Sequence, residues 1–343
     1  MLVKNNSQKK IQKAWGLLSS VIVIAMLLSG CGTAQTSKVY KVGILSGLDA
    51  FAPSVDGFKN KMTELGYIEG ENITYDVQST NVDFAAYQTI TKKFVADKVD
   101  LIFVFPTEAS MEAKTATQGT NIPVIFSLAF TDVPEVDLIN TVREPGGNIT
   151  GVRFPSAEIA NKRLEILLEM VPSAKRIFVP FLKDYPNVPG QLDVIRLQAK
   201  DLGIELIEFA AASPQDLQAE LDRLAALDNV GIDAILMIAE PLAITPVFYD
   251  PLGKFSYEHQ IPIGGALMNV GGDYASIFGL LPDPKVSGEQ AALLADKTLK
   301  GTPAGTIPVV TTESDFRINY AAAQALGVTI PDGLLKQAVE VIR

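Results

Sequence analysis

The same order of predicted elements occurs twice in this chain, and this repeat constrains the fold more than any other feature. Each copy predicts a short apolar strand, a helix ending in Leu-Gly, and further apolar strands separated by helical stretches. Four landmarks recur at offsets between 133 and 139 residues, namely Val42 with Ile177, Gly66 with Gly203, Asp100 with Asp233, and Pro123 with Pro262. The repeat therefore predicts an α/β protein with two similar lobes, each built on a parallel sheet.

The length of the chain permits two hydrophobic cores. With 343 residues, 48% of them hydrophobic, two lobes of ordinary domain size can form. We expect the first lobe at 39–150, completed by about 280–310. The second lobe is expected at 151–278, completed by about 311–343.

The first 30 residues have the pattern of a signal peptide. A basic head with four lysines precedes the apolar stretch 14–28, and Leu28-Ser29-Gly30-Cys31 follows. The apolar stretch is short for a helix that spans a bilayer. The Leu-Ser-Gly-Cys string resembles a bacterial lipobox, which implies cleavage before Cys31 and attachment of a lipid such as palmitate to its sulfur. An uncleaved N-terminal anchor is the alternative; in both cases the fold lies outside the cytoplasmic membrane. Residues 31–38 are expected to be a flexible tether.

Charge and residue counts exclude several functions. After loss of the leader, 25 Lys and Arg stand against 39 Asp and Glu, a net charge of about −14. An acidic surface disfavours nucleic acid as a partner. The chain has one Cys and one His, which excludes a disulfide and a two-histidine zinc site, and no phosphate-binding or nucleophile-elbow motif is present. His259 has the context of a helix C-terminus. We expect a protein without cofactor or metal that is not an enzyme.

Candidate ligand-binding residues follow from the sheet geometry. Ligands of parallel sheets bind outside the carboxyl ends of the strands, so the loops there supply the candidates. A helix predicted to start at Pro106-Thr107 would offer free N–H groups to a carboxylate, although Thr107 as a simple N-cap fits equally well. The candidates in the first lobe are Ser46, Leu48, Asp49, Thr107, Glu108, Ala109, Phe130, Thr131 and Asp132.

At 144–152, where we expect the chain to cross to the second lobe, stands the string Pro-Gly-Gly-Asn-Ile-Thr-Gly-Val. It resembles a hallmark of the ABC transporter substrate-binding lipoproteins related to tryptophan- and tyrosine-binding transport proteins. Segments 56–58, 65–73, 99–102, 121–124 and 319–331 match the same family pattern. The resemblance implies a periplasmic-binding-protein type I fold, with two Rossmann-like lobes, three hinge crossings and a ligand in the cleft. The implied partners are an ABC permease and its ATPase, and the protein is expected to be a monomer.

The second lobe supplies the facing half of the candidate site. Glu240 occupies the loop where the family often has a polar residue, and its charge would hold a ligand ammonium; a solvated loop acid is the alternative. Asp283 is matched to a family aspartate. The candidates in this lobe are Asp184, Tyr185, Glu240, Pro241, Asn269 and Asp283.

Aromatic residues in the candidate loops favour a hydrophobic or aromatic amino acid as the ligand. The only Trp, Trp15, leaves with the leader, so a sugar site built on tryptophan is excluded. A nucleoside or another small polar metabolite is the alternative ligand. A sensory protein that docks on a membrane receptor is the alternative function, and an exported enzyme is a third.

Overall fold

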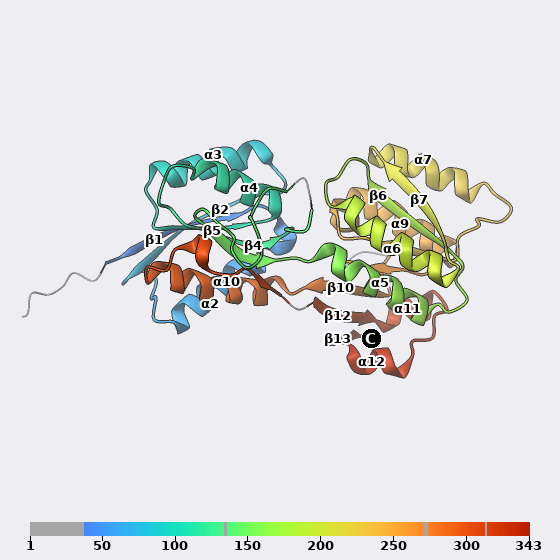
Figure 1. The fold of residues 1–343 in the computed structure, drawn as a ribbon. Coiled ribbons are helices and arrows are strands. Elements are labelled where there is room, and N and C mark those ends of the chain that lie inside the picture. Colours follow the sequence, from blue (N-terminus) through green and yellow to red (C-terminus); the bar gives the residue numbers. More distant parts are fainter. Residues whose placement is uncertain (1–37, 134–135, 270–273, 313) are drawn as a thin grey trace, which may run out of the picture. The chain divides into compact units, whose positions relative to one another are not determined.

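Two sheets, each flanked by helices, organise the residues that the structure describes (Figure 1). This computed structural model describes residues 38–133, 136–269, 274–312 and 314–343, and Tyr40–Arg343 form one structural unit. The predicted leader and Cys31 lie outside the described residues. In the part that is described, no helix combines the length and the apolar character needed to cross a membrane.

The first sheet has six strands among the described residues, in the order β11-β5-β4-β3-β1-β2, and all its pairs are parallel. Helices α3 and α4 cover one face of this sheet, and α2 and α10 cover the other (Figure 1). The strands are β1 (Tyr40–Ser46), β2 (Ile73–Ser79), β3 (Leu101–Phe105), β4 (Val124–Ala129), β5 (Ile149–Arg153) and β11 (Val310–Thr311). The helices are η1 (Asp49–Phe51), α2 (Pro53–Glu64), α3 (Phe84–Ala96), α4 (Thr107–Ala116), α10 (Pro284–Leu299) and η2 (Ala304–Thr306).

Helices α2 and α10 approach so closely that glycine is required at their contact. A Cβ atom on Gly57 of α2 would lie 2.0 Å from the carbonyl oxygen of Lys285, and one on Gly288 of α10 would lie 2.1 Å from that of Ser54. Both distances are far below van der Waals contact. This packing fixes α10, which is remote in sequence, to the first lobe.

The second sheet has seven strands in the described residues, ordered β13-β12-β10-β9-β8-β6-β7, and only the β10–β12 pair among them is antiparallel. The predicted α/β class with parallel-dominated sheets is confirmed. The strands are β6 (Arg176–Leu182), β7 (Glu205–Ala211), β8 (Ala234–Met237), β9 (Ile263–Gly265), β10 (Phe278–Pro282), β12 (Ser314–Asn319) and β13 (Glu340–Ile342). The helices are α5 (Ser156–Met170), α6 (Val188–Leu202), α7 (Pro214–Ala225), α8 (Pro241–Ile244), α9 (Pro246–Glu258), α11 (Tyr320–Ala325) and α12 (Asp332–Gln337).

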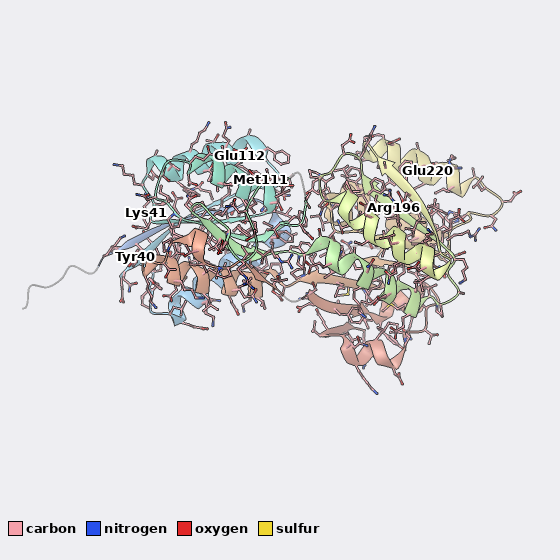
Figure 2. The ribbon with its side chains drawn as sticks, viewed as in Figure 1. Tyr40, Lys41, Met111, Glu112, Arg196 and Glu220 are labelled. Carbon is pink, nitrogen blue, oxygen red and sulfur yellow. The ribbon has the colours of Figure 1, made fainter. Side chains whose placement is uncertain are left out.

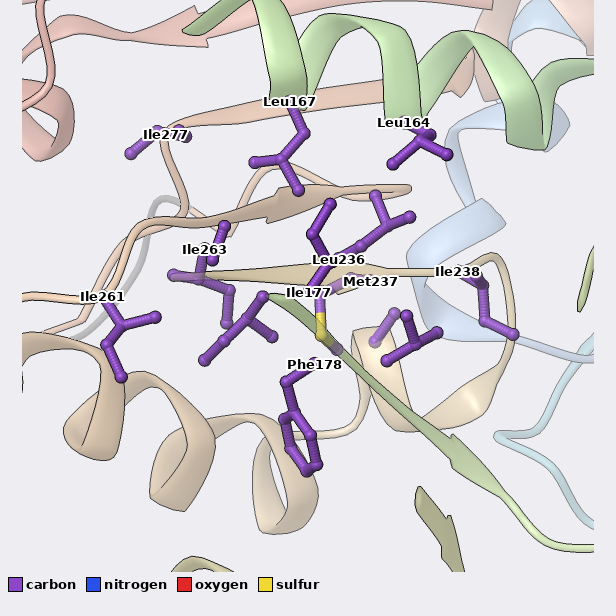
Figure 3. Packing of buried hydrophobic residues seen from close by; sticks show 14 of the residues in the cluster. Leu164, Leu167, Ile177, Phe178, Leu236, Met237, Ile238, Ile261, Ile263 and Ile277 are labelled. Carbon is purple, nitrogen blue, oxygen red and sulfur yellow. The ribbon is translucent and has the colours of Figure 1, made fainter. Parts of the chain in front are cut away.

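The core of the second lobe lies where α5 packs on the central strands β8 and β9. Leu164 and Leu167 of α5 face Leu236 of β8, and all three side chains are fully buried (Figure 3). The apolar stripe of the helix and the apolar face of the sheet thus bury each other. The helical spacing of apolar residues in α5 and the continuous apolar runs of the strands lead to this packing.

The chain passes between the two sheets three times. It leaves the first sheet after Arg153, returns after Pro282, and leaves it again after Thr311. The first passage lies a few residues beyond the predicted one, because residues 149–153 form β5 and pair with β4. Strand β11 starts only at Val310, since η2 and its C-cap Ile307 precede it.

The repeat seen in the sequence has a structural counterpart at the entrance of one strand in each lobe. The Asp100 carboxylate accepts a 2.8 Å hydrogen bond from the backbone N–H of Lys41, a residue labelled at the start of β1 in Figure 2. The Asp233 carboxylate accepts 2.8 Å bonds from the N–H groups of Lys175 and Arg176, at the start of β6. Equivalent acids therefore tie equivalent strands together.

Candidate functional site

A cavity lined by residues of both lobes is the candidate site. It contains about 740 Å³ of space free of protein atoms, part of it open to solvent. Residues of the first lobe and of the passage after β5 that line it are Leu48, Phe51, Val82, Phe84, Tyr87, Pro106, Glu108, Leu128, Phe130 and Phe154. Residues of the second lobe that line it are Tyr185, Ala239, Glu240, Pro241, Ala243, Ile244, Thr245, Ala266, Leu267 and Leu281.

The structure brings six of the residues predicted from the sequence to this cavity. They are Leu48, Glu108, Phe130, Tyr185, Glu240 and Pro241, and they follow the strands β1, β3, β4, β6 and β8. In every case the residue lies just past the carboxyl end of a strand, where ligands of parallel sheets bind.

The other candidates of the first lobe lie outside the lining. Ser46 ends β1, Asp49 begins η1, and Ala109 is buried within α4. Thr107 is buried at the first turn of α4, where its hydroxyl oxygen accepts a 3.0 Å hydrogen bond from the N–H of Phe130. This bond fixes the backbone at Phe130. The last two, Thr131 and Asp132, have side-chain oxygens shielded from solvent without a hydrogen-bond partner in the described residues.

Three candidates of the second lobe lie outside the lining as well. Asp184 lines a separate surface hollow beside β6. The Asn269 side chain donates to the carbonyl of the cavity residue Ala243 at 3.2 Å, which places it behind the wall. Asp283 is the N-cap of α10, accepts from the N–H groups at 285 and 286, and pairs with Arg317 at 3.3 Å. The structure thus gives Asp283 a capping role at the second passage between the lobes.

Several cavity residues were missed by sequence reasoning. Val82, Phe84 and Tyr87 come from the segment after β2, which the strand-end rule would have identified. Leu128 lies in an irregularity of β4, with φ at 51°, which nothing in the sequence signals. Phe154 reaches the cavity from the first passage between the lobes.

Glu240 is the most deeply buried charged group of the lining. Its side chain is 6% exposed, and Oε2 accepts a 2.9 Å bond from the N–H of Leu242, at the start of α8. Oε1 has no hydrogen-bond partner among the described residues. Burial raises the pKa of this carboxyl to about 8. A buried acceptor without a partner is costly, so the cavity presents a site for a donor.

Side-chain hydrogen bonds fix the backbone at Ala239, the residue before Glu240. Gln191 of α6 accepts from the N–H of Ala239 at 2.9 Å and donates to its carbonyl at 3.0 Å, and Asn187 donates to the same carbonyl at 2.6 Å. Arg163 of α5, fully buried, donates to Gln191 at 3.4 Å, and burial lowers the pKa of its guanidinium to about 9. This network fixes the position from which Glu240 enters the cavity.

Glu108 provides the second acid of the lining. It stands in the first turn of α4, where the positive end of the helix dipole favours a negative charge. The Tyr185 phenol donates a 2.8 Å hydrogen bond to its Oε1. Burial, followed by the charge of Glu108, raises the pKa of the Tyr185 phenol far above its usual value, so Tyr185 remains a donor.

Apart from these two acids and Thr245 the lining is apolar and aromatic, and the lining identified in the described residues includes no Lys, Arg or His. Nor do the described residues contain a group of three or more His, Cys, Asp or Glu placed to hold a metal ion. The arrangement can enclose an apolar body and pair with a cationic group, but it offers neither a nucleophile–base pair nor a metal centre for a reaction.

Comparison with known proteins assigns the family. A family model described as ABC transporter substrate binding protein matches residues 41–342. The chain belongs to this family. ABC substrate-binding proteins are extracytoplasmic and bind solutes without being enzymes, so the predictions of no enzymatic function and of a location outside the cytoplasm agree with the family.

A curated relative of this substrate-binding protein is a tyrosine-binding protein of Clostridioides difficile strain R20291. The two are 28% identical in an alignment that covers 92% of this chain and 93% of the relative.

Solved structures show the same fold. A conserved domain protein of Vibrio cholerae has a TM-score of 0.75 and 25% identity, over 89% of this chain and 100% of that chain. A Streptococcus ABC domain in complex with L-Trp has a TM-score of 0.76 and 23% identity, over the same shares. A ligand-free, open substrate-binding protein with adhesive properties from Clostridium difficile has a TM-score of 0.70 and 25% identity, over 89% and 99%. The predicted periplasmic-binding-protein type I fold of this substrate-binding protein is confirmed.

Proposed function

We propose that this protein is the lipid-anchored solute receptor of an ABC importer and that it captures a hydrophobic or aromatic amino acid in the cavity between its lobes. The observation that carries the ligand class is Glu240, whose Oε1 is buried in an apolar cavity without a partner. An α-ammonium group supplies the missing donor, and the charge of the pair makes that hydrogen bond strong. The tyrosine-binding relative supports the same ligand class.

The aromatic rings of the cavity suit the ligand's side chain. Phe130 and Phe154 lie with ring centroids 5.4 Å apart on one part of the wall, and Tyr185 lines the cavity from the second lobe. Such rings bury large apolar area and contact other rings favourably. Residues 131, 132, 184 and 269 stay candidates for contacts with the bound ligand.

Capture and delivery require the lobes to move, and the three passages between the sheets provide the hinge. Few segments link the lobes, so rotation about them changes the cavity while each core stays intact. The closed, loaded form then docks on the permease, whose ATPase drives import.

The ligand class is tested by binding to the chain from residue 32 onward, which contains the whole structural unit Tyr40–Arg343. The only tryptophan, Trp15, is absent from this chain, so the fluorescence of added L-tryptophan reports binding directly. Thermal-shift measurements extend the test to other amino acids and to nucleosides. We expect saturable binding of aromatic or hydrophobic amino acids; shifts with nucleosides alone would contradict the proposal.

The lipid anchor is tested separately in cells. In the full chain, Cys31→Ser removes the sulfur that would carry the lipid. Metabolic labelling with a palmitate analogue should be lost in the same variant. Unchanged labelling would exclude Cys31 as the attachment site.

A further inference from the structure

We propose that the cavity recognises its ligand by an ammonium group next to an apolar or aromatic body, and that a ligand carboxylate adds little to the affinity. The ligand class is then apolar primary amines, of which amino acids are the members that also carry a carboxylate. This inference rests on the proposed function and specifies which group of the ligand is recognised.

The charges of the lining carry the first step. Glu108 and Glu240 line the cavity from opposite lobes, and no Lys, Arg or His is among the described lining residues. Residues 134–135, 270–273 and 313, which the structure does not describe, contain none of these three types either. A ligand carboxylate would therefore enter an apolar space with no cationic side chain, where the charge of Glu108 repels it and where it would disfavour ionisation of Glu240 further.

The start of α4 offers backbone N–H groups that would suit a ligand carboxylate, but the protein already places an acid there. Glu108 stands in the first turn of this helix and its Oε1 accepts the Tyr185 phenol at 2.8 Å. The helix dipole is thus matched by the chain's own carboxylate. A ligand carboxylate at the same place would lie beside Glu108 and lose most of the benefit.

A ligand ammonium meets the opposite situation. Oε1 of Glu240 is buried and lacks a hydrogen-bond partner within the described part of the chain, and an ammonium has three donors to offer. The surrounding rings of Phe130, Phe154 and Tyr185 can add cation–π attraction. An ammonium beside this carboxyl also favours its ionised form, so the open polar contact suits a cation.

The test compares three indoles with the chain from residue 32 onward. L-tryptophan carries both groups, tryptamine lacks the carboxylate, and indole-3-propionate lacks the ammonium. All three fluoresce, and this chain has no tryptophan of its own. We expect tryptamine to bind at least tenfold more tightly than indole-3-propionate. A smaller difference, or the reverse order, overturns the inference.

The same measurements separate this inference from the proposed function. If tryptophan binds but tryptamine does not exceed indole-3-propionate by tenfold, the inference fails and the proposed function stands. If none of the indoles binds, the same triplet is made for whichever hydrophobic amino acid gives a thermal shift. If no amino acid gives one, the proposed function fails and the inference fails with it.

A variant pair identifies the group responsible. Glu240→Gln keeps the size of the side chain and an oxygen for the N–H of Leu242, but removes the charge. We expect this variant to bind tryptamine at least tenfold more weakly, while its affinity for indole-3-propionate stays the same or rises. Glu258→Gln, which removes an exposed α9 carboxylate paired with Lys254, is the control and should change neither. Equal losses for both ligands in Glu240→Gln would contradict the assignment.

Discussion

The phenol of Tyr185 donates a 2.8 Å hydrogen bond to Oε1 of Glu108, and the two residues belong to different lobes. Tyr185 follows β6 of the second sheet, whereas Glu108 lies on α4, which packs on β3 and β4 of the first. Both line the cavity. Moving the lobes apart breaks this bond, so it stabilises the closed arrangement in which a ligand is enclosed.

We therefore predict that Tyr185→Phe weakens ligand binding. The substitution keeps the ring but leaves a carboxylate oxygen of Glu108 without its donor, at a cost of about 1–3 kcal/mol for a hydrogen bond to a charged group. Affinity for L-tryptophan should fall by roughly tenfold or more in a fluorescence titration.

Tyr257→Phe is the matched control for this change. Its phenol donates to the carbonyl of Ala275 at 3.1 Å, within the second lobe and outside the cavity lining. We expect this variant to lose some stability without a loss of affinity. Equal affinities for the Tyr185 variant and the wild type would show that the bond between the lobes has no role in closure.

The buried carboxyl of Glu240 should make the stability of the protein depend on pH. Burial raises the pKa of its carboxyl from 4.5 to about 8 in the folded protein, so the folded state holds this proton more tightly than the unfolded chain. The free energy of unfolding should therefore fall as the pH rises from about 4.5 to about 8, by about 1 kcal/mol per pH unit.

The measurement is denaturant unfolding of wild type and Glu240→Gln between pH 5 and pH 9. The glutamine variant cannot ionise at this position, so its stability relative to the wild type should rise across the range and level off above about pH 8. Parallel pH profiles of the two proteins would refute this origin of the pH dependence.

The contact between α2 and α10 predicts large losses from small substitutions. In Gly57→Ala and Gly288→Ala the new methyl group would lie 2.0 Å and 2.1 Å from carbonyl oxygens of the facing helix. Because backbone atoms cannot move aside cheaply, each change should lower the free energy of unfolding by about 1–3 kcal/mol. Thermal and denaturant unfolding measure the loss.

Gly190→Ala is the control for this helix contact. This glycine lies within α6, and the nearest atom to a new methyl group would be 3.9 Å away, so alanine should leave the stability unchanged or raise it by about 0.5–1 kcal/mol. If Gly190→Ala lowered the free energy of unfolding as much as Gly57→Ala, close packing of α2 on α10 would not explain the loss at Gly57.

A substitution at Val82, at the edge of the cavity, should increase the stability of the protein. This β-branched residue has φ at 55°, a left-handed conformation that strains such side chains, and it is 47% exposed. Val82→Asn should raise the free energy of unfolding by about 1 kcal/mol, because asparagine adopts this conformation more readily. Val247→Asn, at a comparably exposed position on α9 with ordinary backbone, should give no gain.

Sequence reasoning identified most of the fold because the apolar runs and helix ends are clear. Helix α3 (Phe84–Ala96) has ends that the sequence signals, since Asp83 caps its start and a polar turn follows its end. Strand β5 was missed because Asn148-Ile149-Thr150-Gly151 has too little apolar character to signal a strand. Its strand conformation comes from pairing with β4, which is a tertiary contact.

Only those cavity residues that directly follow strands were predicted from the sequence. Leu128 turns into it because β4 is irregular at that point, and Phe154 because the passage between the lobes brings it there. For Asp283 the sequence indicates an acid near a ligand, but cannot show that the N–H groups of α10 already occupy its carboxylate. Which groups bind a given side chain depends on the neighbours that compete for it in the folded protein, and the sequence alone does not show these neighbours.

The place of β11 and α10 has a consequence for synthesis. The first sheet takes its edge strand from Val310–Thr311, and one of its covering helices from Pro284–Leu299. A nascent chain that has emerged only as far as residue 280 therefore has an incomplete N-terminal half with the apolar partner surface of α2 uncovered. Neither half can reach its native state on the ribosome before almost the whole polypeptide has been made, which leaves a long interval for chaperones or a translocation channel to engage it.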